Sequence, residues 1–137
     1  MLALPESHLS LVTQPLGCVI TTLAPNGLPQ STAMWFLYDE AYDGGTGAVR
    51  FSLLEHRRKF RNLQANPACT FFLMNPDNMG DVIEVRGRAV FDPDPDKSFV
   101  IKVREQYGAS GPPTDGPDDN RWIVTIDPER INAHGSR

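Results

Sequence analysis

The chain has 137 residues, of which 40% are hydrophobic, so a single domain with one packed core is expected over residues 1–137. Its formal net charge is −4, which argues against nucleic acid as a partner, because binding to a phosphate backbone needs an excess of Lys and Arg. The sequence has no apolar run of membrane-spanning length and no basic-then-apolar secretory signal, so we expect a cytoplasmic protein without a membrane partner.

The cysteines and histidines do not indicate a metal centre. Cys18 and Cys69 each lie in an apolar, strand-like run and are expected to be buried free thiols. The sequence contains no Cys-x-x-Cys motif, and its three histidines are far apart. We therefore expect no bound metal.

The first half of the chain predicts a short helix and then an antiparallel meander. A helical turn is expected at 9–12, and strands are expected at 18–23, 29–38 and 48–53. Asn26-Gly27 suits the positive φ angles of a tight hairpin between the first two strands. A glycine-rich turn at 43–47 leads into the third strand.

The second half alternates between helices and strands. A short helix is expected at 55–66, stopped by Pro67, and strands are expected at 69–74 and 82–91. Asp94-Pro95 has the composition of a helix start, and Gly108 of a helix end. The segment 109–120 is expected to be a loop whose acidic residues are solvated: Asp115, Asp118 and Asp119. A last strand is expected at 122–126, followed by a short tail that ends in Gly-Ser-Arg.

These elements predict a mainly β fold. About six strands, joined mostly by hairpins and accompanied by two or three short helices, favour a split antiparallel β-barrel, closed or partly closed. The sequence shows no internal repeat and no second domain.

A basic turn is the first functional signal. His56-Arg57-Arg58-Lys59 stands where the helix at 55–66 begins, and a helix N-terminus already carries a partial positive charge. A bound phosphate would relieve this repulsion, because free backbone N–H groups and guanidinium groups both suit an anion. Ser52 could add a hydroxyl donor. The alternative is a solvated basic helix face on a plain dimeric scaffold.

The order of these motifs resembles a known family. The Asn26-Gly27 turn is followed by Pro-Gln-Ser-Thr-Ala-Met-Trp-Phe at 29–36, by Arg-Arg-Lys-Phe-Arg-Asn-Leu at 57–63 with Asn66-Pro67, and by Val-Arg-Gly-Arg-Ala at 85–89. Over roughly residues 9–131 the chain resembles the FMN-binding split barrels of the pyridoxamine 5′-phosphate oxidase-like superfamily, and among them the branch that uses the deazaflavin coenzyme F420.

The resemblance implies a homodimer with two cofactor sites at the subunit interface. It implies that Arg57 and Lys59 grip the cofactor phosphate. The other positions that it implies are, beside the phosphate, Arg58, Phe60 and Asn62; along the ring, Met34, Trp35 and Phe36; as hydrogen-bond donors, Gln30, Thr32 and Ser52; and from the partner subunit, Arg121 and Trp122.

The function that follows from the resemblance is an F420-dependent oxidoreductase. Hydride would pass between the deazaflavin and a small electron-poor organic substrate, with the protein supplying anchoring, ring orientation and a water-poor pocket. No catalytic side chain is assigned. Two alternatives are an FMN-dependent oxidoreductase of the same fold and a non-catalytic carrier of flavin, F420 or haem.

Overall fold

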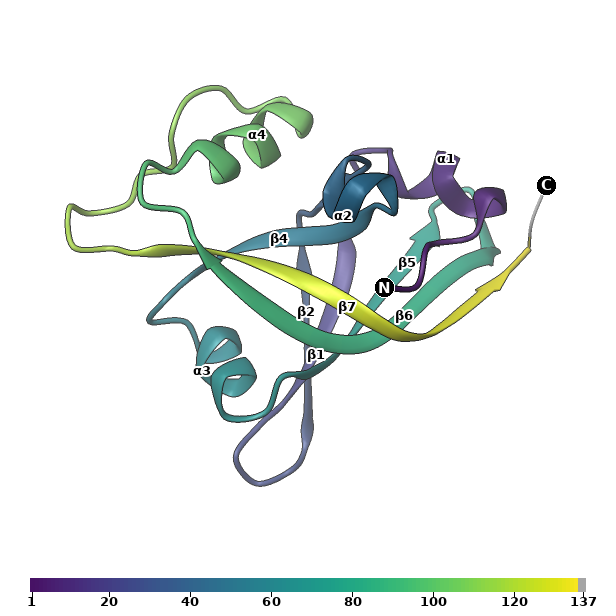
Figure 1. The fold of residues 1–137 in the computed structure, drawn as a ribbon, viewed down its shortest axis with the longest axis horizontal. Helices are drawn as coiled ribbons and strands as arrows, with labels where there is room; N and C mark the ends of the chain where they lie inside the picture. Colours follow the sequence, from purple (N-terminus) through teal and green to yellow (C-terminus); the bar gives the residue numbers. More distant parts are fainter. Residues whose placement is uncertain (136–137) are drawn as a thin grey trace.

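The computed structural model describes residues 1–135 and contains a curled antiparallel sheet with short helices around it (Figure 1). The helical elements are a 3₁₀ turn at Glu6–His8, α1 (Leu9–Val12), α2 (Tyr42–Gly45), α3 (Arg58–Ala65) and α4 (Ser98–Gln106). The strands are β1 (Cys18–Leu23), β2 (Pro29–Met34), β3 (Leu37–Asp39), β4 (Ala48–Leu54), β5 (Ala68–Asn75), β6 (Asn78–Pro93) and β7 (Arg121–His134).

The sheet closes on itself where its two edge strands follow one another in the chain. The strand order is β2-β1-β5-β6-β7-β4-β3, so β2 and β3 lie at opposite edges. Only Trp35 and Phe36 separate them, and the three Cα–Cα steps from Met34 to Leu37 span at most about 11 Å. The sheet must therefore curl until its edges meet, which confirms the predicted split antiparallel barrel. We call this junction the seam.

The predicted strand at 29–38 is thus two strands interrupted at the seam, and the barrel has seven strands within residues 1–135 rather than six. The expected tail after Ile126 was wrong as well, because β7 continues to His134 and pairs with β6 along most of its length. The sequence did not predict this extension because the residues after Ile126 are mostly polar and include Pro128, which is unusual inside a strand. Pro128 is tolerated because it faces Gly87 at a register shift of the ladder.

Both long helices begin later than predicted. The chain makes a turn at 55–57 before α3 begins at Arg58. The Asp94 carboxylate does cap α4, as a residue of its type should, by accepting hydrogen bonds from the backbone N–H groups of Phe99 (3.2 Å) and Val100 (3.1 Å). The helix itself starts only at Ser98, because the chain turns at Lys97, which has a φ of 62°.

The barrel interior is filled by the inward-facing residues of the strands and by one side of α3. Its largest fully buried side chains include four phenylalanines: Phe36, Phe51, Phe60 and Phe71. Cys18 and Cys69 are buried and free, as expected, and burial raises the pKa of each thiol to about 12. Residues 136 and 137, in the expected C-terminal tail, lie outside the described residues.

Candidate functional site

The start of α3 gathers three cations, Arg57, Arg58 and Lys59, that have no acidic partner among the described residues, whereas His56 just before them lies 3.5 Å from the Asp119 carboxylate. Arg57 is the N-cap, its side chain makes no capping hydrogen bond, and no acidic residue lies in the first helical turn. None of the ion pairs found within residues 1–135 involves Arg57, Arg58 or Lys59. The nearby Glu55 carboxylate instead accepts a hydrogen bond from the Asn120 side-chain amide at 2.9 Å. The turn can therefore accept an anion.

Lys59 is the least exposed of the three cations in this turn. It is partly buried, whereas Arg57 and Arg58 are exposed. Burial, and then the charge of Arg57, lower the pKa of Lys59, while the neighbouring Cys18 has a smaller opposite effect. Because Cys18 is the register partner of Met34, this places the Lys59 ammonium close to the seam end of β2.

The inward side of β2 carries three of the predicted cofactor residues. Gln30, Thr32 and Met34 stand opposite Thr22, Ile20 and Cys18 of β1, respectively. Since β2 is an edge strand, these side chains border the opening of the barrel rather than its closed interior. Within the described chain, the buried Thr32 Oγ1 has no hydrogen-bond partner, so it is available to a ligand at this edge.

Asn62 joins α3 to this strand. Its side-chain amide donates hydrogen bonds to Thr22 Oγ1 at 3.0 Å and to Gln30 Oε1 at 2.9 Å, and only 2% of the residue is exposed. We therefore assign Asn62 mainly to holding α3 against the β1–β2 hairpin. Arg58 lines hollows of about 510 Å³ and 330 Å³ beside this hairpin.

Two predicted site residues are core residues instead. Phe36 is fully buried and packs edge-to-face on Phe71, and Phe60 packs against the rings of Phe91 and Trp122. Neither side chain reaches the surface of the chain. The aromatic residues at these two positions are therefore explained by packing of the core. Trp35, in contrast, points outward and is 44% exposed.

Ser52 and Arg121 belong to a second polar cluster on the outer side of the barrel. Their inward neighbours Phe51, Leu53 and Trp122 alternate with them along β4 and β7. Arg121 donates to Ser52 Oγ at 3.3 Å. This cluster and α3 lie on opposite faces of the sheet, so within one chain Ser52 and Arg121 do not lie beside the cations of α3.

The centre of the second cluster is Asp115, which the sequence had suggested was a solvated loop residue. Its side chain is only 5% exposed and accepts hydrogen bonds from Arg121 Nε (2.8 Å), Arg121 Nη2 (2.9 Å) and Lys97 Nζ (3.1 Å). These hydrogen bonds, Arg121 first, lower the pKa of Asp115 to about 2. An acidic residue in a proline-rich loop carries no signal of such a contact, because an irregular loop has no periodic pattern that relates Asp115 to Arg121 and Lys97, 6 and 18 residues away.

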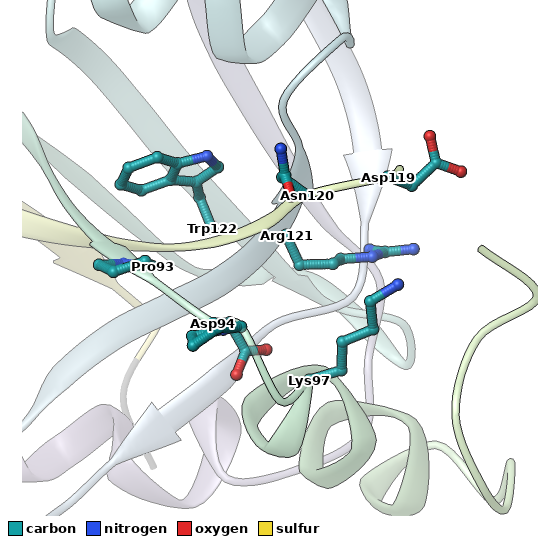
Figure 2. A pocket seen from close by; sticks show the side chains of 8 residues that line it. Pro93, Asp94, Lys97, Asp119, Asn120, Arg121 and Trp122 are labelled. Carbon is teal, nitrogen blue, oxygen red and sulfur yellow. The ribbon is translucent and has the colours of Figure 1, made fainter. Parts of the chain in front are cut away.

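A hollow of about 240 Å³ adjoins this cluster (Figure 2). The Lys97 side chain, from the start of α4, and the Arg121 side chain, from the start of β7, converge on one side of it, where both donate to Asp115. Its other lining residues are Pro93, Asp94, Pro95, Asp119, Asn120 and Trp122. Trp122 Nε1 is buried and lacks a partner in the part of the chain that the structure describes, so a hydrogen-bond donor remains here.

Part of the outer surface of β1 and β5 is apolar. Val19, Phe72 and Met74 are 36%, 37% and 42% exposed and line a hollow of about 240 Å³ together with Leu16, Gly17 and Pro76. We call these six residues the apolar patch. As for membranes, no helix in residues 1–135 combines the length and the hydropathy needed to cross a bilayer.

Comparison with known proteins matches this fold and sequence to one family. The family described as pyridoxamine 5′-phosphate oxidase matches residues 4–135. Among solved structures, one named as an F420 reductase has 35% sequence identity over 94% of this chain and 98% of its own, with a TM-score of 0.79. No match was found among curated proteins.

Two further solved structures share the fold at lower identity. A conserved hypothetical protein from Mycobacterium tuberculosis has 22% identity and a TM-score of 0.72, covering 97% of this chain and 86% of its own. A pyridoxamine 5′-phosphate oxidase-related, FMN-binding protein from Nostoc punctiforme has 14% identity and a TM-score of 0.59, covering 84% and 71%. The match over nearly the whole length, on a split barrel of the same topology, shows that this chain belongs to the pyridoxamine 5′-phosphate oxidase family.

Proposed function

We propose that this protein is an oxidoreductase that uses coenzyme F420, with each cofactor site built at the interface of a homodimer. The observation that carries the proposal is the start of α3, where Arg57, Arg58 and Lys59 have no carboxylate partner within the described residues. The 35% identity to an F420 reductase over 94% of the chain supports the same choice of cofactor.

The cofactor phosphate would bind at the first turn of α3. The backbone N–H groups there lack a side-chain cap, and Arg57 can supply two parallel donors to a phosphate. Lys59 would contribute a partly desolvated ammonium, whose attraction to an anion is stronger than that of a fully hydrated one. Placing a dianion among these cations would relieve their mutual repulsion.

The ring of the cofactor would lie along the opening of the barrel beside β2. Met34 and Trp35 offer apolar surface, and the unpartnered hydroxyl of Thr32 offers a hydrogen bond to a polar ring atom. When bound, the deazaflavin supplies the hydride-transfer chemistry. The protein's part would be to hold the ring, keep water away and leave one face open to an electron-poor substrate.

The second copy of the chain would dock on the apolar patch. Monomeric proteins rarely leave exposed aliphatic and aromatic side chains clustered on one sheet face. Ser52 and Arg121 lie on a different face from α3, so they would serve the partner's cofactor rather than their own. Arg121 is already held by Asp115, whereas the Trp122 indole packs against Phe60 of α3 on the inward side of β7.

Titration with both candidate cofactors tests the proposal. We expect the purified protein to bind F420 more tightly than FMN, measured through the fluorescence of each cofactor. Arg57→Ala and Lys59→Ala should each weaken binding by roughly 10- to 100-fold, the scale of a charged hydrogen bond. Lys102→Ala, which removes an exposed cation from α4, is the matched control and should bind normally.

The outcome also separates the alternatives. Preference for FMN would indicate the FMN-dependent oxidoreductase, and binding of neither cofactor would reject the proposal. Turnover of reduced F420 with a panel of enones and quinones distinguishes an enzyme from a carrier, because a carrier would bind the cofactor and leave it reduced.

A further inference from the structure

The outward side chain of Trp35 is held by a single aromatic contact. Its indole ring stacks on the Tyr107 ring, with a centroid separation of 4.7 Å and an interplanar angle of 10°. Among the ring contacts found in residues 1–135, Trp35 takes part only in this one, and the side chain remains 44% exposed. One face of the indole is therefore covered by Tyr107, and the other is available.

Tyr107 is in turn fixed by its hydroxyl. The hydroxyl donates a hydrogen bond to the Leu16 carbonyl at 2.7 Å and accepts one from the Phe36 backbone N–H at 3.1 Å. These groups lie 91 and 71 residues away in the chain, so the bonds are features of the tertiary fold. Burial raises the pKa of Tyr107 to about 12, which keeps the hydroxyl protonated as a donor.

The stacking of Trp35 on Tyr107 is not needed to fill the barrel core. Phe36 already fills the barrel at the seam, and Trp35 contributes little to the core because it is half exposed. A flat side chain held against a second flat side chain has few accessible rotamers, so it presents a ready-made plane at low entropic cost. The plane stands at the seam end of β2, directly after Met34, on the strand proposed to run along the cofactor ring.

We propose that Tyr107 is a positioning residue, which acts through Trp35 to present a fixed aromatic platform to the planar ring of the bound cofactor. The inference rests on the proposed function, because it takes the ligand to be a flavin or deazaflavin. It adds a residue of the C-terminal end of α4 to a site otherwise built from β2 and α3. Tyr107 itself need not touch the ligand.

A double-mutant cycle on cofactor binding tests this role. Tyr107→Leu should weaken F420 binding about three- to tenfold, the scale of one aromatic contact, and Trp35→Leu should do the same. Because Tyr107 acts through Trp35, Tyr107→Leu should cause no further loss when Trp35→Leu is already present. Tyr107→Phe keeps the ring and removes both hydrogen bonds of the hydroxyl, so its F420 affinity should lie closer to that of the wild type than to that of Tyr107→Leu. Tyr42→Phe on α2 is the control and should bind as the wild type does.

Two results would overturn the inference. One is wild-type affinity in Tyr107→Leu, and the other is an equal loss in the presence and absence of Trp35, which would indicate a general structural effect. If Tyr107→Leu does not fold, Tyr107→Phe takes its place in the cycle, with a smaller loss expected that again disappears in Trp35→Leu.

The same titrations distinguish this inference from the proposed function. Normal binding by the Tyr107 variants together with weak binding by Arg57→Ala rejects only the platform. The reverse pattern rejects only the phosphate assignment. A wild-type protein that binds neither F420 nor FMN rejects both.

Discussion

Asp115 and Arg121 form a two-point ion pair in which Arg121 Nε and Nη2 donate to the two carboxylate oxygens at 2.8 and 2.9 Å. Lys97 Nζ adds a third hydrogen bond at 3.1 Å. Through these contacts the loop at 109–120 is attached to the start of α4 and the start of β7. The loop that the composition suggested was unattached therefore has a specific anchor.

Removing this anchor should destabilise the fold in a pH-dependent way. Asp115→Asn leaves two cations without their partner, so we expect a loss of roughly 1–3 kcal/mol in the free energy of unfolding at pH 7. The pKa of Asp115 is lowered from its usual 3.8 to about 2, so the carboxylate stabilises the fold above pH 4 and that contribution disappears between pH 4 and 2.

Urea unfolding at pH 7 and at pH 2.5 measures this effect. The difference between wild type and Asp115→Asn should shrink at the lower pH. Asp118→Asn, on the same loop and exposed, should have little effect at either pH. A difference that stays constant over this range would show that the ion pair does not contribute the stability assigned to it.

Cofactor binding should weaken in alkaline solution because of Lys59. Burial and the charge of Arg57 lower its pKa, so the ammonium loses its proton at a lower pH than an ordinary lysine does. Below this pKa the protonated Lys59 contributes fully to cofactor binding, and above it the neutral amine no longer attracts the phosphate. In Lys59→Arg the charge persists, so the decline in F420 affinity should move to higher pH. Identical pH profiles for the two proteins would contradict the assignment of Lys59.

Asn62 should matter for stability more than its place on a short helix suggests. Asn62→Ala removes both hydrogen bonds that join α3 to β1 and β2 and leaves Thr22 and Gln30 without these donors. We expect a loss of roughly 2 kcal/mol in the free energy of unfolding. Gln64→Ala, exposed on the same helix, is the control. Denaturant unfolding of both variants would show whether the amide bridge is required.

Gly87 should not tolerate a side chain. A Cβ at this position would collide with the backbone carbonyl of Asp127, where the register of β6 and β7 shifts. Because backbone atoms cannot move aside as a flexible side chain can, Gly87→Ala should cost roughly 2–4 kcal/mol. Gly116→Ala is a matched control outside the apolar patch, since a Cβ there comes no closer than 3.4 Å to another residue, which is an ordinary contact. Equal thermal midpoints for the two variants would disprove the close approach.

The apolar patch should control the oligomeric state. Phe72→Glu places a charge in the middle of the proposed subunit interface, where it would be desolvated without a partner, so it should convert a dimer into a monomer. Val90→Glu changes another exposed apolar residue of the sheet that lies outside the patch, and it should leave the mass unchanged. Light scattering during gel filtration measures both. A wild-type monomer would reject the proposed interface.

Local patterns in the sequence predicted most of the secondary structure. The Asn26-Gly27 hairpin, the alternating strands and the Asp94 cap depend on neighbouring residues, whose chemistry is visible in a short window. The predictions were wrong where contacts between distant segments determine the secondary structure. The extension of β7 to His134 depends on pairing with β6, and the division of β2 from β3 depends on closure of the barrel.

Hydrophobic period, turn residues and charge can be read from short stretches of the chain, and they predicted the barrel, the buried free thiols and a cluster of cations at the start of α3. Which aromatic residues are core and which are exposed became evident from the folded barrel, where Phe36 and Phe60 are buried and Trp35 is exposed. The tertiary structure also revealed that Asn62 bridges α3 to β2, and that Asp115 neutralises Arg121. Asn62 and Gln30 are 32 residues apart, and Asp115 and Arg121 are joined across an irregular loop, so no local pattern records which side chains the closed barrel brings within hydrogen-bonding distance.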